Sequence, residues 1–332
     1  MPIYNAPIQD MKFILNDVFN AADFWQKNEQ LAHVDSDTVN MILEEMSKSA
    51  KNTLLPINRS GDEEGAQYLG EGKVKTPTGF KAAFDEYAQG GWIGLGGDPN
   101  HGGQGMPKMV TMLAEEMVFT ANQSFALYPN LSGGACMCIY NAGSEEQKQT
   151  YLEKIYSGEW TGTMCLTEPH AGTDLGIIKT KAVPNQDGSY NITGTKIFIT
   201  AGEHDLADNI IHLVLAKTPD APAGSKGISL FIVPKFHVNA DGSLGERNAV
   251  SCGSIEHKMG IKASATCVMN FDGAKGFMVG AENTGLASMF IMMNYERLTM
   301  GLQGIGGAEL AYQNATAYTL DRIQGRADSG IQ

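Results

Sequence analysis

The chain has 332 residues, of which 42% are hydrophobic and 18% charged, a composition typical of a folded globular protein with room for two or three domains. Its formal net charge of −13, without a basic cluster, argues against nucleic acid and against an anionic membrane surface as partners. The first residues lack the basic and apolar regions of a secretory signal, and no long apolar run predicts a membrane-spanning helix.

The cysteines argue against a zinc site and against a disulfide framework. They are odd in number, and their spacing includes no C-x-x-C pair. A reducing compartment, with the cytoplasm as the default, is therefore expected for Cys136, Cys138, Cys165, Cys252 and Cys267.

Residues 1–158 are predicted to form a helical domain. Apolar residues recur there at helical spacing in several segments, including SDTVNMILEEMSKSA, with Ser36 as the expected N-cap. A second segment, SEEQKQTYLEKIYSGE, opens with Ser144 followed by Glu and Gln, which predicts a capping box.

Residues 159–281 change to short segments rich in β-branched residues and separated by turn signals such as NQDGS. They predict a compact β-domain, either a barrel or a sandwich. Helical spacing returns over 282–332, where Glu296 and Arg297 are the only charged residues between Ala287 and Ala308. That composition predicts a helix buried on nearly every side.

The order of these regions predicts an α+β multidomain protein rather than an alternating βαβ fold. Two glycine-rich stretches, 94–105 and 301–309, raise the question of a dinucleotide site. Neither has a complete G-x-G-x-x-G between a strand and a helix, so neither satisfies that fingerprint.

The stretch MCLTEPHAGTDLG, residues 164–176, has two interpretations. Its polar residues and glycines suit an ordinary turn between strands. They equally suit a loop that brings Thr167, Thr173 and backbone N–H groups close to a ligand, because Gly172 permits a close approach. The residues alone leave both interpretations open.

Two downstream segments carry similar alternatives. In TGTKIFITAG, residues 193–202, strand alternation places Phe198 and Thr200 on one face, where they could cover a planar heterocycle. In MNYERLTMG, residues 293–301, Glu296 is either one half of a salt-bridged pair or a buried general base. The arginines of LDRIQGR, residues 320–326, either close a helix or bind a pyrophosphate.

Together these segments resemble the acyl-CoA dehydrogenase family, and the resemblance covers essentially the whole chain. CLTEPHAGTD matches the family's C-[VLI]-T-E-P-x-A-G-[ST]-D signature, and TGTKIFITAG is similar to its G-x-K-x-[WF]-I-[TS]-x-[GA] strand. HGGQGMP resembles its Y-G-G-x-G loop, with His101 in place of the commoner Tyr. The opening residues resemble the large bacterial subgroup, which includes long-chain acyl enzymes and one that acts on 3-methylmercaptopropionyl-CoA.

The resemblance implies an N-terminal helical domain, a β-domain, the first part of a C-terminal helical bundle, and FAD as cofactor. It implies that the flavin is bound by Met164, Leu166, Thr167, Phe198 and Thr200, and acyl-CoA by Thr173, Asn294 and Arg297. It also implies that Arg322 and Gln324 reach the FAD pyrophosphate of a neighbouring subunit, hence a homodimer or homotetramer.

The implied reaction is α,β-dehydrogenation of an acyl-CoA thioester to the trans-2-enoyl-CoA, with electrons passing to an electron-transferring flavoprotein. The alternatives are an acyl-CoA oxidase that uses O2 and an inactive fragment or pseudoenzyme. The implied base is either Glu296 or a glutamate beyond residue 332, since most of the family has its base farther along the chain. We accordingly expect these 332 residues to be part of a longer enzyme.

Overall fold

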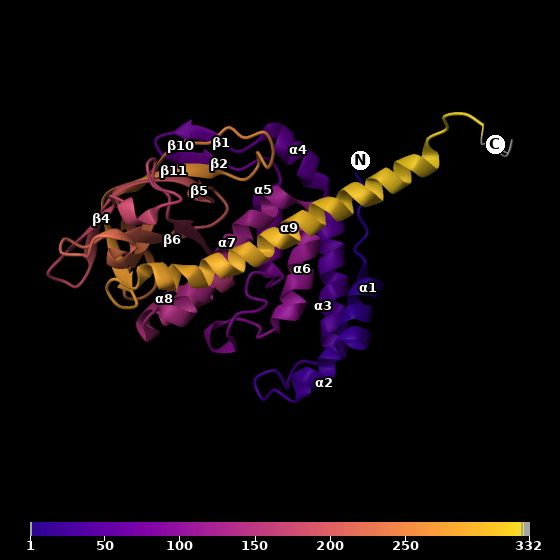
Figure 1. Cartoon of the computed structure of the whole chain (residues 1–332), viewed down its shortest axis with the longest axis horizontal. Helices are drawn as coiled ribbons and strands as arrows, with labels where there is room; N and C mark the ends of the chain where they lie inside the picture. Colours follow the sequence, from indigo (N-terminus) through magenta and orange to yellow (C-terminus); the bar gives the residue numbers. More distant parts are fainter. Residues whose placement is uncertain (1, 327, 329–332) are drawn as a thin grey trace.

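The computed structural model describes residues 2–326 and 328, and its N-terminal part is an assembly of helices (Figure 1). The helices are α1 (Ile8–Phe13), α2 (Ala21–Gln26), α3 (Ser36–Ser49), α4 (Pro56–Glu64), α5 (Phe80–Gln89), α6 (Lys108–Ala121), α7 (Gln123–Ala142) and α8 (Glu145–Tyr156). Short π-helical turns at Ile14–Val18 and Ala50–Leu54 extend α1 and α3.

Helix capping follows the sequence closely, with one shift. The predicted capping box is confirmed, because the Ser144 hydroxyl accepts from the Gln147 N–H while the Gln147 side chain accepts from the Ser144 N–H. The N-cap of α3 is Asp35 and not the predicted Ser36, since the Asp35 carboxylate accepts from the Thr38 N–H at 2.7 Å. Asp and Ser are both good N-cap residues, so residue type does not distinguish Asp35 from Ser36. The position at which the helix begins does.

The helical prediction for residues 1–158 misses a hairpin. Strands β1 (Gln67–Gly70) and β2 (Lys73–Lys75) pair antiparallel through a tight turn in which Glu71 and Gly72 both have positive φ, 50° and 70°. Such a turn suits the right-handed twist of a hairpin. The two strands are too short to show the period-2 pattern that predicts a strand. They lie beside the β-domain, where β1 contacts the strand Val250–Ile255 (Figure 1).

The β-domain contains one long, bent strand that joins two halves of a sheet. Its strands are β3 (Trp160–Cys165), β4 (Lys181–Pro184), β5 (Tyr190–Thr200), β6 (Asn209–Ala216), β7 (Ser229–Pro234), β8 (Phe236–Val238), β9 (Leu244–Arg247), β10 (Val250–Ile255) and β11 (Thr266–Val279). The order β3-β6-β7-β11-β5-β4 is mixed, since only β3 and β6 are parallel, and β10 also pairs with β11. A small β8–β9 hairpin completes the domain.

The two halves of the sheet fold over a common apolar core. β11 pairs with β5 and β10 along its first part and with β7 through Phe277–Val279. Side chains from both halves, including Ile192, Phe231 and Phe271, are fully buried between them. The result is sandwich-like, and the sheet does not close into a barrel.

Helix α7 lies at the centre of the molecule and contacts both β3 and α9 (Gly285–Asp321). Gly162 of β3 packs so closely on α7 that a Cβ there would stand 2.4 Å from the Cβ of Ala135. On the neighbouring face, Gly133 and Gly134 lie against Tyr295 and Glu296 of α9. Small residues thus bring the helical layer, the sheet and α9 into contact.

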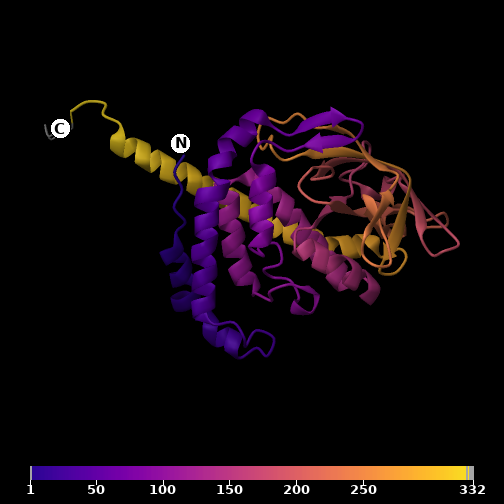
Figure 2. The ribbon, with the colours of Figure 1, turned by 180° about the vertical axis from the view of Figure 1, so that it is seen from behind.

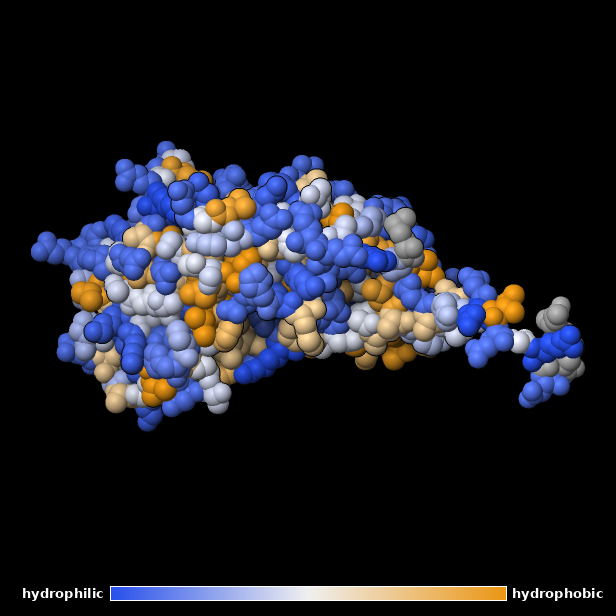
Figure 3. Space-filling model, turned by 90° about the horizontal axis from the view of Figure 1, so that it is seen from above, coloured by the Kyte–Doolittle hydropathy of each residue, from blue (hydrophilic) through white to orange (hydrophobic). Residues whose placement is uncertain are grey.

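The prediction that the last helix is buried on nearly every side is wrong. α9 runs diagonally across the molecule and extends past its body as a single helix (Figures 1 and 2). Only one face is covered, and Leu298 is 52%, Tyr312 69% and Leu320 83% exposed. Figure 3 shows the molecule narrowing toward this end, where hydrophobic and hydrophilic side chains stand together. Among the described residues, no helix is both long enough and apolar enough to cross a membrane.

The close contact between β3 and α7 yields a stability prediction. We expect Gly162→Ala to lower the free energy of unfolding by about 1–3 kcal/mol, because the added methyl group meets Ala135, which cannot rotate away. Gly301→Ala in α9, where a Cβ would meet nothing within 4 Å, is the matched control and should be neutral or stabilising. Urea titration followed by circular dichroism measures both, and equal midpoints would contradict the expected close packing.

Candidate functional site

A buried ion pair fixes the position of the loop that follows β3. Lys196 of β5 donates from Nζ to the Leu166 carbonyl and to Glu168 Oε1, each at 2.9 Å. Lys196 is 0% and Glu168 3% exposed. The Ile197 N–H also donates to the Thr167 carbonyl at 2.8 Å. These bonds hold the segment 164–176 beside the segment 193–202.

The second motif departs from regular strand geometry at its aromatic residue. The β5–β11 register shifts between Cys267 and Met269, which leaves Phe198 in a bulge with φ of 58°. Ala201 follows at φ of 55°. Left-handed backbone is costly for a bulky aromatic residue and tends to gather at functional sites. The predicted simple alternation of Phe198 with Thr200 is therefore interrupted, and Phe198 stands 58% exposed.

The loop and the bulge present hydrogen-bonding groups that the chain leaves unpaired. Among the described residues, the N–H groups of Leu166 and Thr167 have no acceptor, and the hydroxyls of Thr167 and Thr200 have no partner. Met164, half-buried at the end of β3, lies opposite Leu213 in the sheet. The arrangement provides donors and an exposed ring at one place, which suits a planar heterocycle with carbonyl oxygens.

Thr173 lies farther along the same loop and is exposed beyond Gly172. Asp174 next to it accepts from the Gly176 N–H at 2.8 Å and so shapes the turn. The structure thus places Thr173 at the surface of the loop, with its side chain open to a ligand.

Glu296 is buried at the interface of α9 and α7. Its Oε1 has no hydrogen-bond partner among the described residues and faces Gly134, where a Cβ would stand only 2.4 Å away. Burial and, second to it, the charge of Glu115 raise the pKa of Glu296 to about 8, while Lys108 opposes the shift. A carboxyl group with these properties can hold or accept a proton near neutral pH.

A second carboxyl group lies beside it and was not predicted from the sequence. Tyr295 donates from its hydroxyl to Glu115 Oε1 at 2.7 Å, and the Lys108 ammonium lies 4.0 Å from the centre of the Tyr295 ring. Burial raises the pKa of Glu115 to about 7, against the opposing effects of Lys108 and of the Tyr295 hydroxyl. Lys108 and Glu115 share one face of α6, two helical turns apart.

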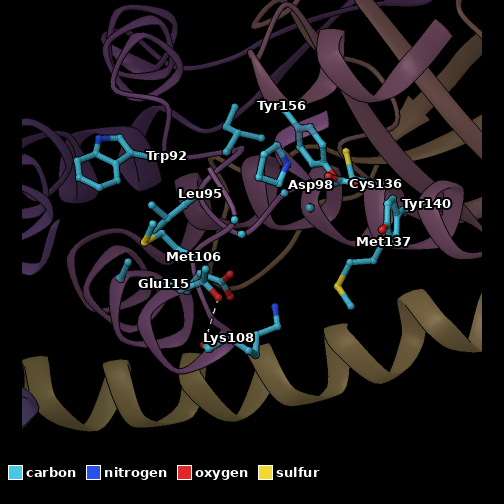
Figure 4. A pocket seen from close by; sticks show the side chains of 18 of the residues that line it. Trp92, Leu95, Asp98, Met106, Lys108, Glu115, Cys136, Met137, Tyr140 and Tyr156 are labelled. Atoms are coloured by element: carbon cyan, nitrogen blue, oxygen red, sulfur yellow. Dashed lines mark hydrogen bonds between the residues drawn. The ribbon is translucent and has the colours of Figure 1, made fainter. Parts of the chain in front are cut away.

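Lys108, Glu115 and Tyr295 line a cavity of about 560 Å³ between α6, α7 and the loop before α6 (Figure 4). The rest of the wall is largely apolar or aromatic and includes Trp92, Leu95, Met106, Met137 and Tyr156. Figure 4 shows Lys108 and Glu115 together next to α9, and Met137 and Tyr140 of α7 beside them on the same side of the cavity as α9. Tyr295 lines the cavity, whereas neither Glu296 nor the loop after β3 is part of its wall.

The remaining predicted residues of α9 lie on its exposed side. Arg297 donates to Asn294 Oδ1 at 3.0 Å and lies over the ring of Phe290, 5.2 Å from its centre. Because adjacent helical residues point about 100° apart, Arg297 faces away from the buried Glu296. The alternative of a Glu296–Arg297 salt bridge is therefore wrong.

Arg322 and Gln324 follow the end of α9 and are exposed. In Figures 1 and 2 this end lies on the far side of the helical layer from the β-domain. Within one chain, the structure does not bring these two residues to the loop after β3.

The sequence signal for the missed residues was weak. Lys196 and Glu168 each belong to one of the two matched motifs, but neither motif shows that the two side chains pair with each other. Lys108, Glu115 and Tyr295 are distant in sequence, and helical spacing alone does not show which faces of α6 and α9 meet. Their grouping is a consequence of tertiary packing.

Comparison with known proteins agrees with this arrangement. The family model described as the acyl-CoA dehydrogenase N-terminal domain matches residues 36–159, and the model for the middle domain matches residues 163–274. The 3-methylmercaptopropionyl-CoA dehydrogenase of Ruegeria pomeroyi is 46% identical over 98% of this chain and 55% of its own length. The chain spans about half the length of the curated relatives it matches most strongly.

Solved structures show the same fold. Butyryl-CoA dehydrogenase from Megasphaera elsdenii superposes with a TM-score of 0.71 at 27% identity, covering 88% of this chain and 71% of that one. An acyl-CoA dehydrogenase from Bacillus anthracis, complexed with FAD, has a TM-score of 0.72 at 26% identity and covers 87% of this chain and 45% of that one.

The raised pKa of Glu296 predicts a pH-dependent stability. The folded chain binds more protons than the unfolded chain between the ordinary value of 4.5 and about 8, so the stability that protonated Glu296 contributes is lost as the pH rises through about 8. We expect Glu296→Gln, which cannot ionise, to gain at least about 1 kcal/mol of unfolding free energy relative to the unmodified chain between pH 5 and pH 9.

Chemical denaturation at several pH values measures this difference. Glu71→Gln, at a carboxyl group that is 87% exposed, is the control and should leave the pH dependence unchanged. A constant difference between Glu296→Gln and the unmodified chain across this range would show that Glu296 is not held protonated by burial.

Proposed function

Because this chain belongs to the acyl-CoA dehydrogenase family, we propose that it binds FAD and acts in the α,β-dehydrogenation of an acyl-CoA thioester to the trans-2-enoyl-CoA. The observation that carries the proposal is the meeting of the loop after β3 with the bulge of β5. There, unpaired N–H groups of Leu166 and Thr167 adjoin the left-handed Phe198. That donor set matches the carbonyl-rich edge of a flavin.

Different residues of this chain would bind different parts of the cofactor. The N–H groups of Leu166 and Thr167 would bind the pyrimidine edge, with Met164 beside them at the end of β3. Phe198 and Thr200 would cover the ring system, one by packing and the other by its hydroxyl. When bound, FAD supplies the acceptor for the hydride that leaves the β-carbon.

Removal of the α-proton falls to a carboxylate, and Glu296 is the candidate within this chain. Among the described residues its Oε1 has no partner, and its raised pKa makes the ionised carboxylate a stronger base, whose population grows as the pH rises toward about 8. A base farther along the longer relatives remains the alternative. Thr173, Asn294 and Arg297 are exposed and would contact the acyl-CoA substrate, with Arg297 near its CoA moiety. The cavity that Tyr295 lines would receive the acyl group.

The partners follow from the same family relationship. We propose an electron-transferring flavoprotein as the electron acceptor, and a homodimer or homotetramer in which Arg322 and Gln324 reach the FAD of a second chain. Their exposure at the far end of α9 is compatible with such a contact. We propose the cytoplasm as the location because all five cysteines are free and buried.

The experiment that tests the proposal is reconstitution with FAD followed by anaerobic mixing with straight-chain acyl-CoA thioesters. We expect a yellow protein whose flavin absorbance bleaches in a single turnover. Glu296→Gln should retain FAD and slow the bleaching by about 10²–10⁴-fold, the usual contribution of a general base. Stopped-flow absorbance measures the rate.

Glu116→Gln is the matched control, because Glu116 is also a partly buried carboxyl group, on α6, but its charged neighbour is Glu309 and not Glu296. It should bleach at the unmodified rate. A chain that remains colourless after incubation with FAD would overturn the proposed function. A Glu296→Gln variant with undiminished bleaching would exclude only Glu296 as the base.

A further inference from the structure

The buried pair of Lys196 and Glu168 does more than hold the loop after β3. We propose that Lys196 is a positioning residue that polarises the Leu166–Thr167 peptide and so strengthens the binding of the reduced flavin relative to the oxidised flavin. This inference rests on the proposed function, since it assumes that the Thr167 N–H faces a flavin.

The geometry places an ammonium directly on that peptide. Lys196 Nζ donates to the Leu166 carbonyl at 2.9 Å, and this carbonyl belongs to the same planar amide as the Thr167 N–H. A donor on the carbonyl draws electron density from the amide nitrogen, which makes the N–H a better donor. The effect is strongest for a charged donor in a buried setting, and Lys196 is fully buried.

Glu168 fixes the position of the ammonium. Its carboxylate accepts from Lys196 at 2.9 Å, from the Thr180 hydroxyl at 2.6 Å, and from the N–H groups of Thr180 and Lys179 at 3.0 and 2.7 Å. Burial alone would raise the pKa of Glu168, but Lys196 and these donors lower it instead. The carboxylate is therefore charged, and it binds both β5 and the two residues that precede β4.

Stability by itself does not require an ion pair at this place. Well-packed apolar residues of similar volume often match or exceed the stability of a buried ion pair, because both charges must give up their hydration. Burial lowers the pKa of Lys196, and the Glu168 charge opposes the shift, which shows that desolvation is significant here. What an apolar pair cannot supply is a charged donor to the Leu166 carbonyl.

The consequence concerns the flavin after reduction. Reduced flavin carries negative charge at its pyrimidine edge, so stronger donors at that edge bind it better than they bind the oxidised form. Loss of the ammonium should therefore weaken binding of the reduced flavin more than that of the oxidised flavin. The reduction potential would become more negative.

A set of variants separates this electrostatic role from a structural one. Lys196→Met leaves Glu168 buried without its cation and should lower stability. The double variant Lys196→Met with Glu168→Gln removes both charges but keeps an amide oxygen that can accept from Thr180, and should recover part of that stability, as measured by thermal unfolding without FAD. Lys196→Arg keeps a charged donor. Lys235→Met is the matched control, because it breaks a different buried pair, with Glu203, that does not contact the Leu166–Thr167 peptide.

The decisive readout is the reduction potential of bound FAD, measured by equilibration with a redox dye. We expect the double variant to lose at least tenfold in affinity for reduced relative to oxidised flavin, equivalent to about 30 mV for a two-electron couple. We expect Lys196→Arg to recover part of this loss and Lys235→Met to leave the potential unchanged.

The two proposals fail in different ways. A double variant that regains stability and also keeps the unmodified potential would overturn the role of Lys196, while the proposed function would stand. An equal shift of the reduction potential in Lys235→Met would also overturn the role of Lys196. The shift would then reflect a general disturbance of the β-domain. An unmodified chain that does not bind FAD would overturn both.

Discussion

The rest of the structure depends on the close approach that small residues allow around α7. Gly162 lets β3 rest on Ala135, and Gly133 and Gly134 let α9 lie against the adjacent face of the same helix. Bulkier side chains at these positions would separate the sheet from the helical layer. The loop after β3 and the carboxyl group of Glu296 both owe their positions to this one helix.

On that framework, the candidate site combines two kinds of buried charge. Lys196 and Glu168 neutralise each other and are hydrogen-bonded throughout, so they act as a rigid support for the loop. Glu115 and Glu296 are only partly compensated by Lys108, and their pKa values rise toward the neutral range. The first arrangement favours fixed geometry, and the second favours exchange of a proton.

The two faces of α9 have different characters. Met289, Met292 and Glu296 lie on the buried face, while Phe290, Asn294 and Arg297 lie on the exposed one. Each face carries apolar side chains and one charged residue, so the sequence does not distinguish the two faces. Which face is covered depends on where α6 and α7 lie, and this is why the predicted all-round burial was wrong.

Much of the architecture could be predicted from the residues alone: the helical N-terminal region with its Ser144 capping box, the β-rich middle region and the long final helix. These features are local, since helical spacing, capping and turn chemistry act over a few residues. Three others were decided by tertiary structure. They are the left-handed bulge at Phe198, the ion pair that joins Lys196 to Glu168, and the raised pKa values of Glu115 and Glu296. Each arises from contacts between segments far apart in the chain, and burial, which sets the cost of a charge, exists only once those segments have packed.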